Sequence, residues 1–411
     1  YKAVVWETGD DIIPRAEGQP AGTAAKLAFD LELSVRDYLN EGGKLLFTGK
    51  YAGFAQGADG AYFYEPDVPA QPECTQLSDP PCLPLLNDFL QYYLGAYSYV
   101  SDGGTGQDGK PYPVKGAGGA FTGFQGTLNG GDSANNQDHT ASFLSTSSFL
   151  PKDRFPQFAT EAPIKWDRPG GAPYDPRTGS WYAYSGQADV SYKRLTRTID
   201  LTGKSSGTLT FQTSYETEAD WDFFFVEART EGQDDWTTLP DANGHTRQAT
   251  GQSCASGWRT LHPHLNHYQG QDCSPTGTTG AWHAATGKSN GYQEWSIDLS
   301  AYAGKKVEVS ITYVSDWATQ GLGVFVDDVK VTADSETIAE TSFETDLGGW
   351  TVAGPPEGSS PAANDWSRSQ RAFEEGAGVV TKDTVYVGFG LEGLSTKARN
   401  DFVKRAMRHL L

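Results

Sequence analysis

The sequence predicts an α/β domain with a parallel sheet, made of two separate stretches of chain, and an all-β sandwich inserted between them. Three observations support this fold class. Residues 1–50 follow a strand, helix, strand pattern, strand patterns without helix signals dominate residues 181–331, and a strand and a helix return at the end. Because a last strand and helix have no place in a sandwich, we expect the α/β domain to comprise residues 1–150 and 371–411. The sandwich then comprises residues 151–370, which fits the two or three domains expected for 411 residues.

The first elements are a strand, a helix and a second strand. Ala3–Trp6 is apolar, residues 24–39 place Ala, Leu and Val at helical spacing, and Lys44–Gly49 is a second apolar run. Two strands joined by a helix normally lie parallel, with a right-handed crossover. Residues 51–150 are loop-rich, with one amphipathic segment at Leu83–Leu94.

The sandwich is predicted from short apolar runs with few helix signals. The candidate strands are Tyr192–Ile199, Gly207–Ser214, Trp221–Ala228, Gln293–Ile297, Lys306–Val314 and Val324–Val331. The four consecutive apolar residues Phe223–Val226 indicate a strand that is buried on both faces, or one that is packed inside a sandwich. After the sandwich, Thr384–Phe389 is a strand and Thr396–Leu411 a helix, with Thr396 as the expected N-cap.

Charge and composition exclude some partners. The chain carries 32 basic and 52 acidic side chains, a net charge of −20, which argues against nucleic acid and anionic membrane surfaces as partners. It has no run of about 18 apolar residues, so we expect no membrane-spanning helix. The chain opens with a strand pattern, Tyr-Lys-Ala-Val-Val-Trp, where a leader would be, so we expect a fragment or a processed product.

The four cysteines form two close pairs in sequence. We predict the disulfides Cys74–Cys82 and Cys254–Cys273, which indicate an oxidising, extracellular location. The alternative is four unpaired, buried thiols.

Acidic residues gather at two predicted strands. Glu218 and Asp222 lie at the start of one strand, and Asp327 and Asp328 lie within another. Crowded carboxylates repel one another unless a cation neutralises them, so we expect a structural Ca²⁺ here, with Asp189 as a further ligand. The alternative is ion pairs with nearby basic residues, namely Lys193, Arg194, Arg197 and Lys330.

Six segments resemble a known module. They are Trp181–Gly186, Leu195–Gly203, Tyr215–Asp222, Ile297–Gly304, Phe325–Val329 and Phe343–Trp350. In this order they resemble the MAM-like jelly roll of immune-inhibitor-A-type secreted peptidases, over about residues 170–366. The flanking α/β pieces resemble a glutamine-amidotransferase-like domain. The combination resembles the C-terminal region of secreted bacterial zinc carboxypeptidases of the carboxypeptidase A-like kind, which implies a peptidase domain upstream of residue 1.

The catalytic groups of these families are missing from the sequence. An amidotransferase carries a nucleophilic Cys in a Gly-x-Cys-x-Gly turn, and here Gly49-Lys-Tyr51-Ala-Gly53 places Tyr51 at that position. A zinc carboxypeptidase needs His-x-x-Glu, which does not occur, so we expect no zinc in this chain. The histidines His262, His264 and His267 lack a carboxylate or thiolate to complete a ligand set, and we favour a structural role for them.

We therefore predict a non-catalytic accessory region that engages substrates or surfaces and adds stability. Its expected partners are the upstream peptidase domain and protein or glycan surfaces. The first alternative is a calcium-dependent carbohydrate-binding module, in which tryptophans would stack on sugars. Packing is the commoner use of such residues, which here include Trp166, Trp181, Trp221, Trp236 and Trp317. The second alternative is a hydrolase of unknown type.

Overall fold

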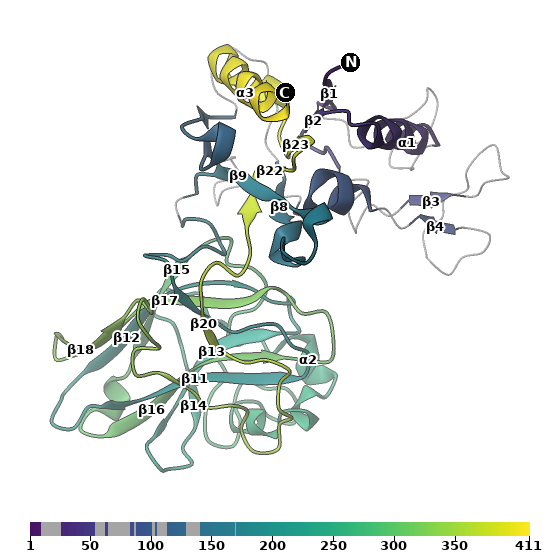
Figure 1. The fold of residues 1–411 in the computed structure, drawn as a ribbon. Helices are drawn as coiled ribbons and strands as arrows, with labels where there is room; N and C mark the ends of the chain where they lie inside the picture. Colours follow the sequence, from purple (N-terminus) through teal and green to yellow (C-terminus); the bar gives the residue numbers. More distant parts are fainter. Residues whose placement is uncertain are drawn as a thin grey trace. The chain divides into compact units, whose positions relative to one another are not determined.

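The structure is a computed structural model, and it describes residues 1–9, 26–53, 62–64, 83–85, 88–100, 103–104, 113–128, 140–168 and 170–411. The chain divides into two compact units. Unit 1 comprises residues 1–168 and 373–411, and unit 2 comprises residues 169–372 (Figure 1). No helix among the described residues is both long and apolar enough to cross a membrane.

Unit 1 is built on a mixed, seven-stranded sheet. Its order is β1 (Val4–Glu7), β2 (Leu45–Thr48), β23 (Thr384–Val387), β22 (Gly378–Val380), β9 (Glu161–Trp166), β6 (Val114–Gly116) and β7 (Gln125–Gly126). The pairs β1–β2 and β2–β23 are parallel, and the remaining pairs are antiparallel. The prediction of a parallel sheet is therefore confirmed only for one half. A smaller sheet, β21–β8–β5, completes the unit (Glu375–Gly376, Ser142–Ser145 and Ala96–Val100).

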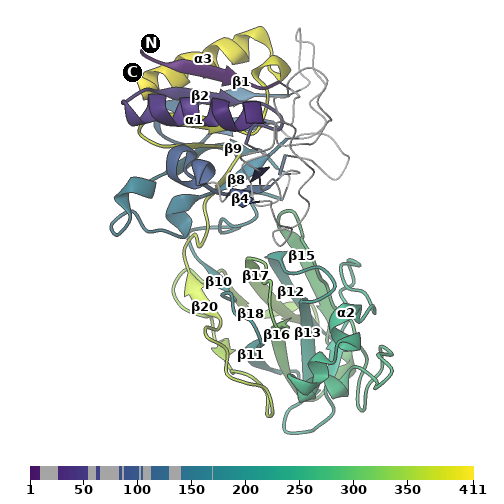
Figure 2. The same cartoon turned by 90° about the vertical axis from the view of Figure 1, so that its right-hand side faces the viewer.

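Helices cover both faces of the parallel half of this sheet. On one face Leu45 and Phe47 of β2 pack in a core with Leu39 of α1 (Lys26–Asn40) and with the π-helix η3 (Phe89–Leu94). On the other face Leu46 packs in a core with Phe402 of α3 (Thr396–Leu410). Successive side chains of a strand point to opposite faces, so a strand as apolar as β2 needs cover on both sides. Figure 2 shows α1 and α3 on either side of β1 and β2.

Within the amphipathic segment Leu83–Leu94, Leu83–Leu85 is strand β4, paired with β3 (Tyr62–Tyr64), and η3 begins at Phe89. Two sequence predictions for unit 1 need correction. The N-cap of α3 is Ser395, whose hydroxyl accepts a hydrogen bond from the Ala398 amide. The first boundary of the sandwich lies after β9 rather than at residue 150, since β9 pairs with β22 and β6.

Unit 2 is a β-sandwich of two antiparallel sheets. The first has the order β15 (Gln293–Asp298), β12 (Gly207–Glu216), β17 (Gly323–Ala333), β10 (Tyr182–Tyr184) and β20 (Ser367–Ser369), with β18 (Glu336–Thr341) paired to β17. The second is β14 (Thr237–Leu239), β13 (Phe223–Thr230), β16 (Lys306–Ser315), β11 (Ser191–Asp200) and β19 (Thr351–Val352). Inward-facing residues of both sheets, such as Phe211, Val226 and Ile311, share one core.

The outer face of the second sheet is covered by the excursion, which we define as residues 240–292 between β14 and β15. Phe224 and Val226 point into the sandwich core, whereas Phe223 and Phe225 pack in a separate core with Trp258 and Trp282 of the excursion. The prediction that Phe223–Val226 is buried on both faces is therefore confirmed. The excursion contains the short helix α2 (Gly251–Ala255) and the 3₁₀ turns η7 (Trp258–Thr260) and η8 (Pro263–His267).

Candidate metal centre

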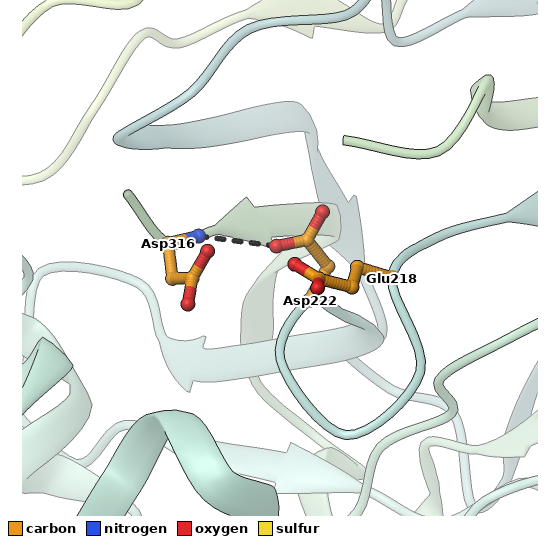
Figure 3. A group of neighbouring side chains, drawn as sticks. All are labelled: Glu218, Asp222 and Asp316. Carbon is orange, nitrogen blue, oxygen red and sulfur yellow. Dashed lines mark hydrogen bonds between the residues drawn. The ribbon is translucent and has the colours of Figure 1, made fainter. Parts of the chain in front are cut away.

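Three carboxylates converge at one end of the second sheet of unit 2. Asp222 precedes β13 and Asp316 follows β16, and these strands are paired with Phe223 opposite Val314, so the two residues meet. Glu218 joins them from the loop between β12 and β13 (Figure 3). An oxygen from each of the three lies within 4.8 Å of the others, so the group can hold a metal ion.

Burial dominates the electrostatics of this group, and repulsion between the carboxylates adds a smaller effect. Asp222 is fully buried; it accepts hydrogen bonds from the Tyr313 hydroxyl at 2.7 Å and from the Asp316 amide at 3.1 Å. Burial, with the charges of Asp316 and Glu218, raises the pKa of Asp222 from 3.8 to about 7. Burial also raises the pKa of Asp316 and of Glu218. A cation bound between them would relieve this penalty.

No basic side chain forms an ion pair with these carboxylates among the described residues, although ion pairs were the alternative to a metal. The ammonium of Lys193 donates to the Ser185 carbonyl at 3.0 Å and to Asn364 at 2.9 Å. Arg194 donates to the Gly354 carbonyl at 3.0 Å, and Arg197 donates to the carbonyl of Gly348. The positive charge of buried Lys193 does act on Asp222 at longer range, but burial lowers the pKa of Lys193 to about 8.

Asp189 lies near this group, as its influence on the pKa of Asp316 shows. Its carboxylate accepts a hydrogen bond from the Gln320 side chain at 2.6 Å, and the next residue, Val190, donates from its amide to the Asp316 carbonyl. Asp189, which the sequence suggested as a further ligand, thus lies next to Asp316. Asp316 itself was not among the ligands predicted from the sequence.

Asp327 and Asp328 lie elsewhere, at a bulge in β17. The register places Gly323 opposite Glu216 and Asp327 opposite Gln212, so Asp327 is well away from the strand end that leads to Glu218. The fully buried Asp327 carboxylate accepts hydrogen bonds from the Thr178 and Asp328 amides, and burial raises its pKa to about 7. The expectation of one site formed by Glu218, Asp222, Asp327 and Asp328 therefore needs correction, since the structure separates the two pairs.

Asp316 shows what the sequence could not reveal. It lies two residues after the end of a predicted strand, as many surface carboxylates do, so its position alone gives no signal. Only the pairing of β13 with β16 brings it beside Asp222. That pairing joins residues about 90 positions apart, and such a register cannot be derived from one sequence.

The turn at residues 49–53, which resembles the nucleophile elbow of an amidotransferase and which we call the elbow, follows β2. Gly49 and Gly53 have φ values of 155° and 78°, which favour glycine, and a Cβ at Gly53 would lie 2.1 Å from the Tyr386 hydroxyl oxygen. Tyr51 is half-buried between them, with the Lys50 ammonium 5.3 Å from its ring centre. A phenol is a poor nucleophile at neutral pH, because its ordinary pKa is about 10. Residues 54–61, where a helix would follow the nucleophile, lie outside the described residues.

Three of the five histidines of the excursion were considered as metal ligands, and each of them hydrogen-bonds a different partner. His262 hydrogen-bonds the Ser315 carbonyl at 3.0 Å, His264 the Tyr268 hydroxyl at 3.1 Å and His267 the Thr279 hydroxyl at 2.9 Å. Burial lowers the pKa of His262 to about 4 and of His264 to about 3, so both are neutral at pH 7. Among the described residues, the one group of three or more metal-ligating side chains consists of carboxylates.

Cys254 and Cys273 form a disulfide within the excursion. Cys74 and Cys82 lie outside the described residues. Of the tryptophans considered for sugar stacking, Trp166 and Trp236 are buried, and Trp181 lies beneath the Arg368 guanidinium at 3.5 Å. Trp317, which is 42% exposed, directly follows Asp316.

A known family model matches part of unit 2, and the matched residues include two of the three carboxylates of the candidate metal centre. Residues 172–276 match the family model "Immune inhibitor A-like, MAM domain", which covers Glu218 and Asp222 and stops before Asp316.

Two relatives are similar over a larger part of the chain. The "Pre-pro-metalloprotease PrtV" of Vibrio cholerae serotype O1 is 24% identical over 171 residues, which is 41% of this chain and 15% of that protein. "Immune inhibitor A" of Bacillus thuringiensis subsp. alesti is 26% identical over 187 residues, which is 44% of this chain and 22% of that protein. The similarity thus spans less than a quarter of the length of either relative.

Proposed function

We propose that this chain is a non-catalytic accessory region of a secreted zinc metallocarboxypeptidase, whose active site lies upstream of residue 1. The observation that carries the proposal is the match of residues 172–276 to an immune inhibitor A-like MAM domain, together with the similarity to a metalloprotease. The disulfide Cys254–Cys273 supports an extracellular location. The accessory region would engage substrates or surfaces and stabilise the enzyme.

The proposal also specifies the kind of metalloprotease, namely a carboxypeptidase. This assignment rests on the resemblance of residues 1–150 and 371–411 to a glutamine-amidotransferase-like domain that carries an inserted jelly roll. The three parallel strands β1, β2 and β23, with α1 and α3 on opposite faces, support such a domain in unit 1. Tyr51 at the elbow supports the loss of its original chemistry.

The test is an activity assay on the purified chain. We expect no turnover of glutamine and no release of C-terminal residues from peptides, because the elbow lacks a thiol and no His-x-x-Glu is present. Zinc measured after dialysis should be well below one per chain. Turnover, or zinc bound at one per chain, would contradict the accessory role.

We also infer that Glu218, Asp222 and Asp316 bind a structural Ca²⁺. Support comes from the all-oxygen donor set, which suits a hard cation, and from a buried carboxylate with no ion-pair partner among the described residues. Millimolar extracellular calcium would fill even a weak site. The ion would link the start of β13 to the end of β16, and so stabilise the sandwich.

One observation favours the alternative of a calcium-dependent carbohydrate-binding module. Exposed Trp317 adjoins Asp316, so its ring could stack on a sugar held beside the ion. A polysaccharide pull-down with and without calcium tests this alternative, with Trp317→Ala as the variant that should abolish binding.

A further inference from the structure

A second feature of unit 2, separate from the metal centre, is an open pocket of about 590 Å³. Strands β17 and β18 and the loop at residues 342–348 enclose it. Lys330 of β17 and Glu340 of β18 line the pocket and lie directly opposite each other in the strand pairing. The volume is in the range of pockets that hold small molecules or side chains, and it far exceeds that of a single ion.

The loop that forms the wall is held in place by hydrogen bonds. The Glu344 carboxylate accepts from the amides of Ser180 and Trp181, each at 2.9 Å. Asp346 accepts from the Gly348 amide at 2.7 Å. The Arg368 guanidinium donates to the carbonyls of Phe343 and Glu344. The wall is therefore organised before any ligand binds, which lowers the entropic cost of binding.

The pocket is strongly acidic. Four acidic residues line it, Asp328, Glu340, Glu344 and Asp346, and Lys330 is the single basic residue among those that line it. None of the five takes part in an ion pair among the described residues. No three of the carboxylates bring oxygens within 4.8 Å of one another, unlike those of the metal centre. Negative charge spread around a cavity of this size suits an extended organic cation better than a metal ion.

We propose that this pocket binds basic side chains of a peptide segment, with arginine preferred over lysine. The planar guanidinium presents five N–H donors and can contact two carboxylates at once, whereas an ammonium is a compact point charge. The hydroxyl groups of Thr341, Ser342 and Thr345 supply further acceptors along the rim. The site is independent of the function proposed above, since it needs neither calcium nor a peptidase domain.

The test uses the full chain and a fluorescent peptide, Gly-Arg-Gly-Arg-Gly, followed by anisotropy in 0.15 M salt, where the screening length is about 8 Å. The matched probe replaces both arginines with citrulline, which keeps the shape and removes the charge. The pocket variant is Glu340→Gln with Asp346→Asn. The control variant, Glu231→Gln with Glu357→Gln, removes the same charge from exposed positions outside the pocket. Thermal melting checks that both variants are folded.

We expect the arginine peptide to bind, the citrulline peptide not to bind, and the pocket variant to weaken binding about tenfold, the loss of two charge-assisted contacts. The control variant should change affinity by less than about twofold. Equal weakening by both variants would show non-specific attraction to an acidic protein and overturn the proposal. Displacement of the peptide from the wild-type chain by calcium, with binding restored by chelator, would identify a metal site instead. That result would also overturn the proposal.

Discussion

At the scale of single residues, the raised pKa of Asp222 means that the metal centre should affect how the free energy of unfolding depends on pH. The folded pKa, about 7, is raised above the ordinary 3.8, so this carboxyl stabilises the metal-free fold most below pH 4 and loses that contribution as pH rises through 7. His262 and His264 change in the opposite sense. Their folded pKa values are lowered, so their contribution is lost as pH falls from 6.5 towards 4 and 3. A pH profile of the wild type alone would mix these effects.

The first residue-scale prediction therefore compares the wild type with Asp222→Asn, which imitates the protonated carboxyl. In chelator, the wild type should lose stability relative to the variant as pH rises from 4 to 8, because only the wild type must ionise a buried group. In calcium at a hundredfold excess over its Kd, the wild type should gain about 2.7 kcal/mol and the variant little. Chemical denaturation across pH measures both. Identical pH profiles, or no response to calcium, would contradict the site.

The second residue-scale prediction concerns Glu227, a carboxylate buried beneath the excursion. It accepts hydrogen bonds from the hydroxyls of Tyr192, Tyr268 and Thr312 at 2.6, 2.8 and 3.2 Å. Glu227→Ala leaves the buried hydroxyls of Tyr192 and Thr312 without this acceptor and leaves the Tyr268 hydroxyl only its contact with His264, so we expect a loss of about 3 kcal/mol in the free energy of unfolding. Glu227→Gln keeps an acceptor oxygen and should cost less. Equal losses in the two variants would contradict this expectation, because Gln keeps the size of Glu and one of its two acceptor oxygens.

At the scale of elements, the sequence predicts strands well and their partners poorly. The apolar run Phe223–Val226 predicts a buried strand, and of the two arrangements that the run allows, the structure shows cover on both faces. The sequence does not reveal that the excursion supplies the outer cover, since Trp258 and Trp282 read as loop residues. It also misses the antiparallel half of the sheet in unit 1. There β6, β7 and β22 have two or three residues each and carry no periodic signal.

The same limit applies to the candidate site. Glu218 and Asp222 are conspicuous because they precede a strongly apolar strand. Asp327 and Asp328 are equally conspicuous, yet the register of β12 with β17 places them elsewhere. Charge density along a sequence indicates where carboxylates must be accommodated, whereas strand pairing decides which of them meet.

The element-scale prediction concerns the disulfide of the excursion. Cys254 and Cys273 are 19 positions apart, and closing a loop of this length contributes about 3 kcal/mol in the chain-entropy model. The double variant Cys254→Ser, Cys273→Ser should therefore lower the free energy of unfolding by about that amount. We expect proteolysis between these positions first, as a local opening of the excursion. The wild type in reducing agent should behave like the variant, and unchanged protection in both would contradict a stabilising role.

At the scale of the whole molecule, contacts within unit 1 join the two positions at which the chain leaves the unit and re-enters it, residues 168 and 373. Arg168, the last residue of its first segment, pairs with Glu375 near the start of its second at 3.0 Å, and both side chains are buried. Glu375 also accepts from the Ser142 hydroxyl at 2.5 Å. The two ends of unit 1 are thus fixed together by contacts made within unit 1 alone.

We therefore predict that residues 169–372 can be removed and replaced by a short Gly/Ser linker that joins residue 168 to residue 373. The product should be soluble and unfold cooperatively, because its sheet and both cores consist of residues of unit 1. The matched control carries Glu375→Gln in the shortened chain. It should be less stable, since Arg168 is then left buried without its anionic partner. Circular dichroism and thermal melting measure both. A shortened chain that aggregates or melts without cooperativity would mean that unit 1 depends on unit 2 for its fold.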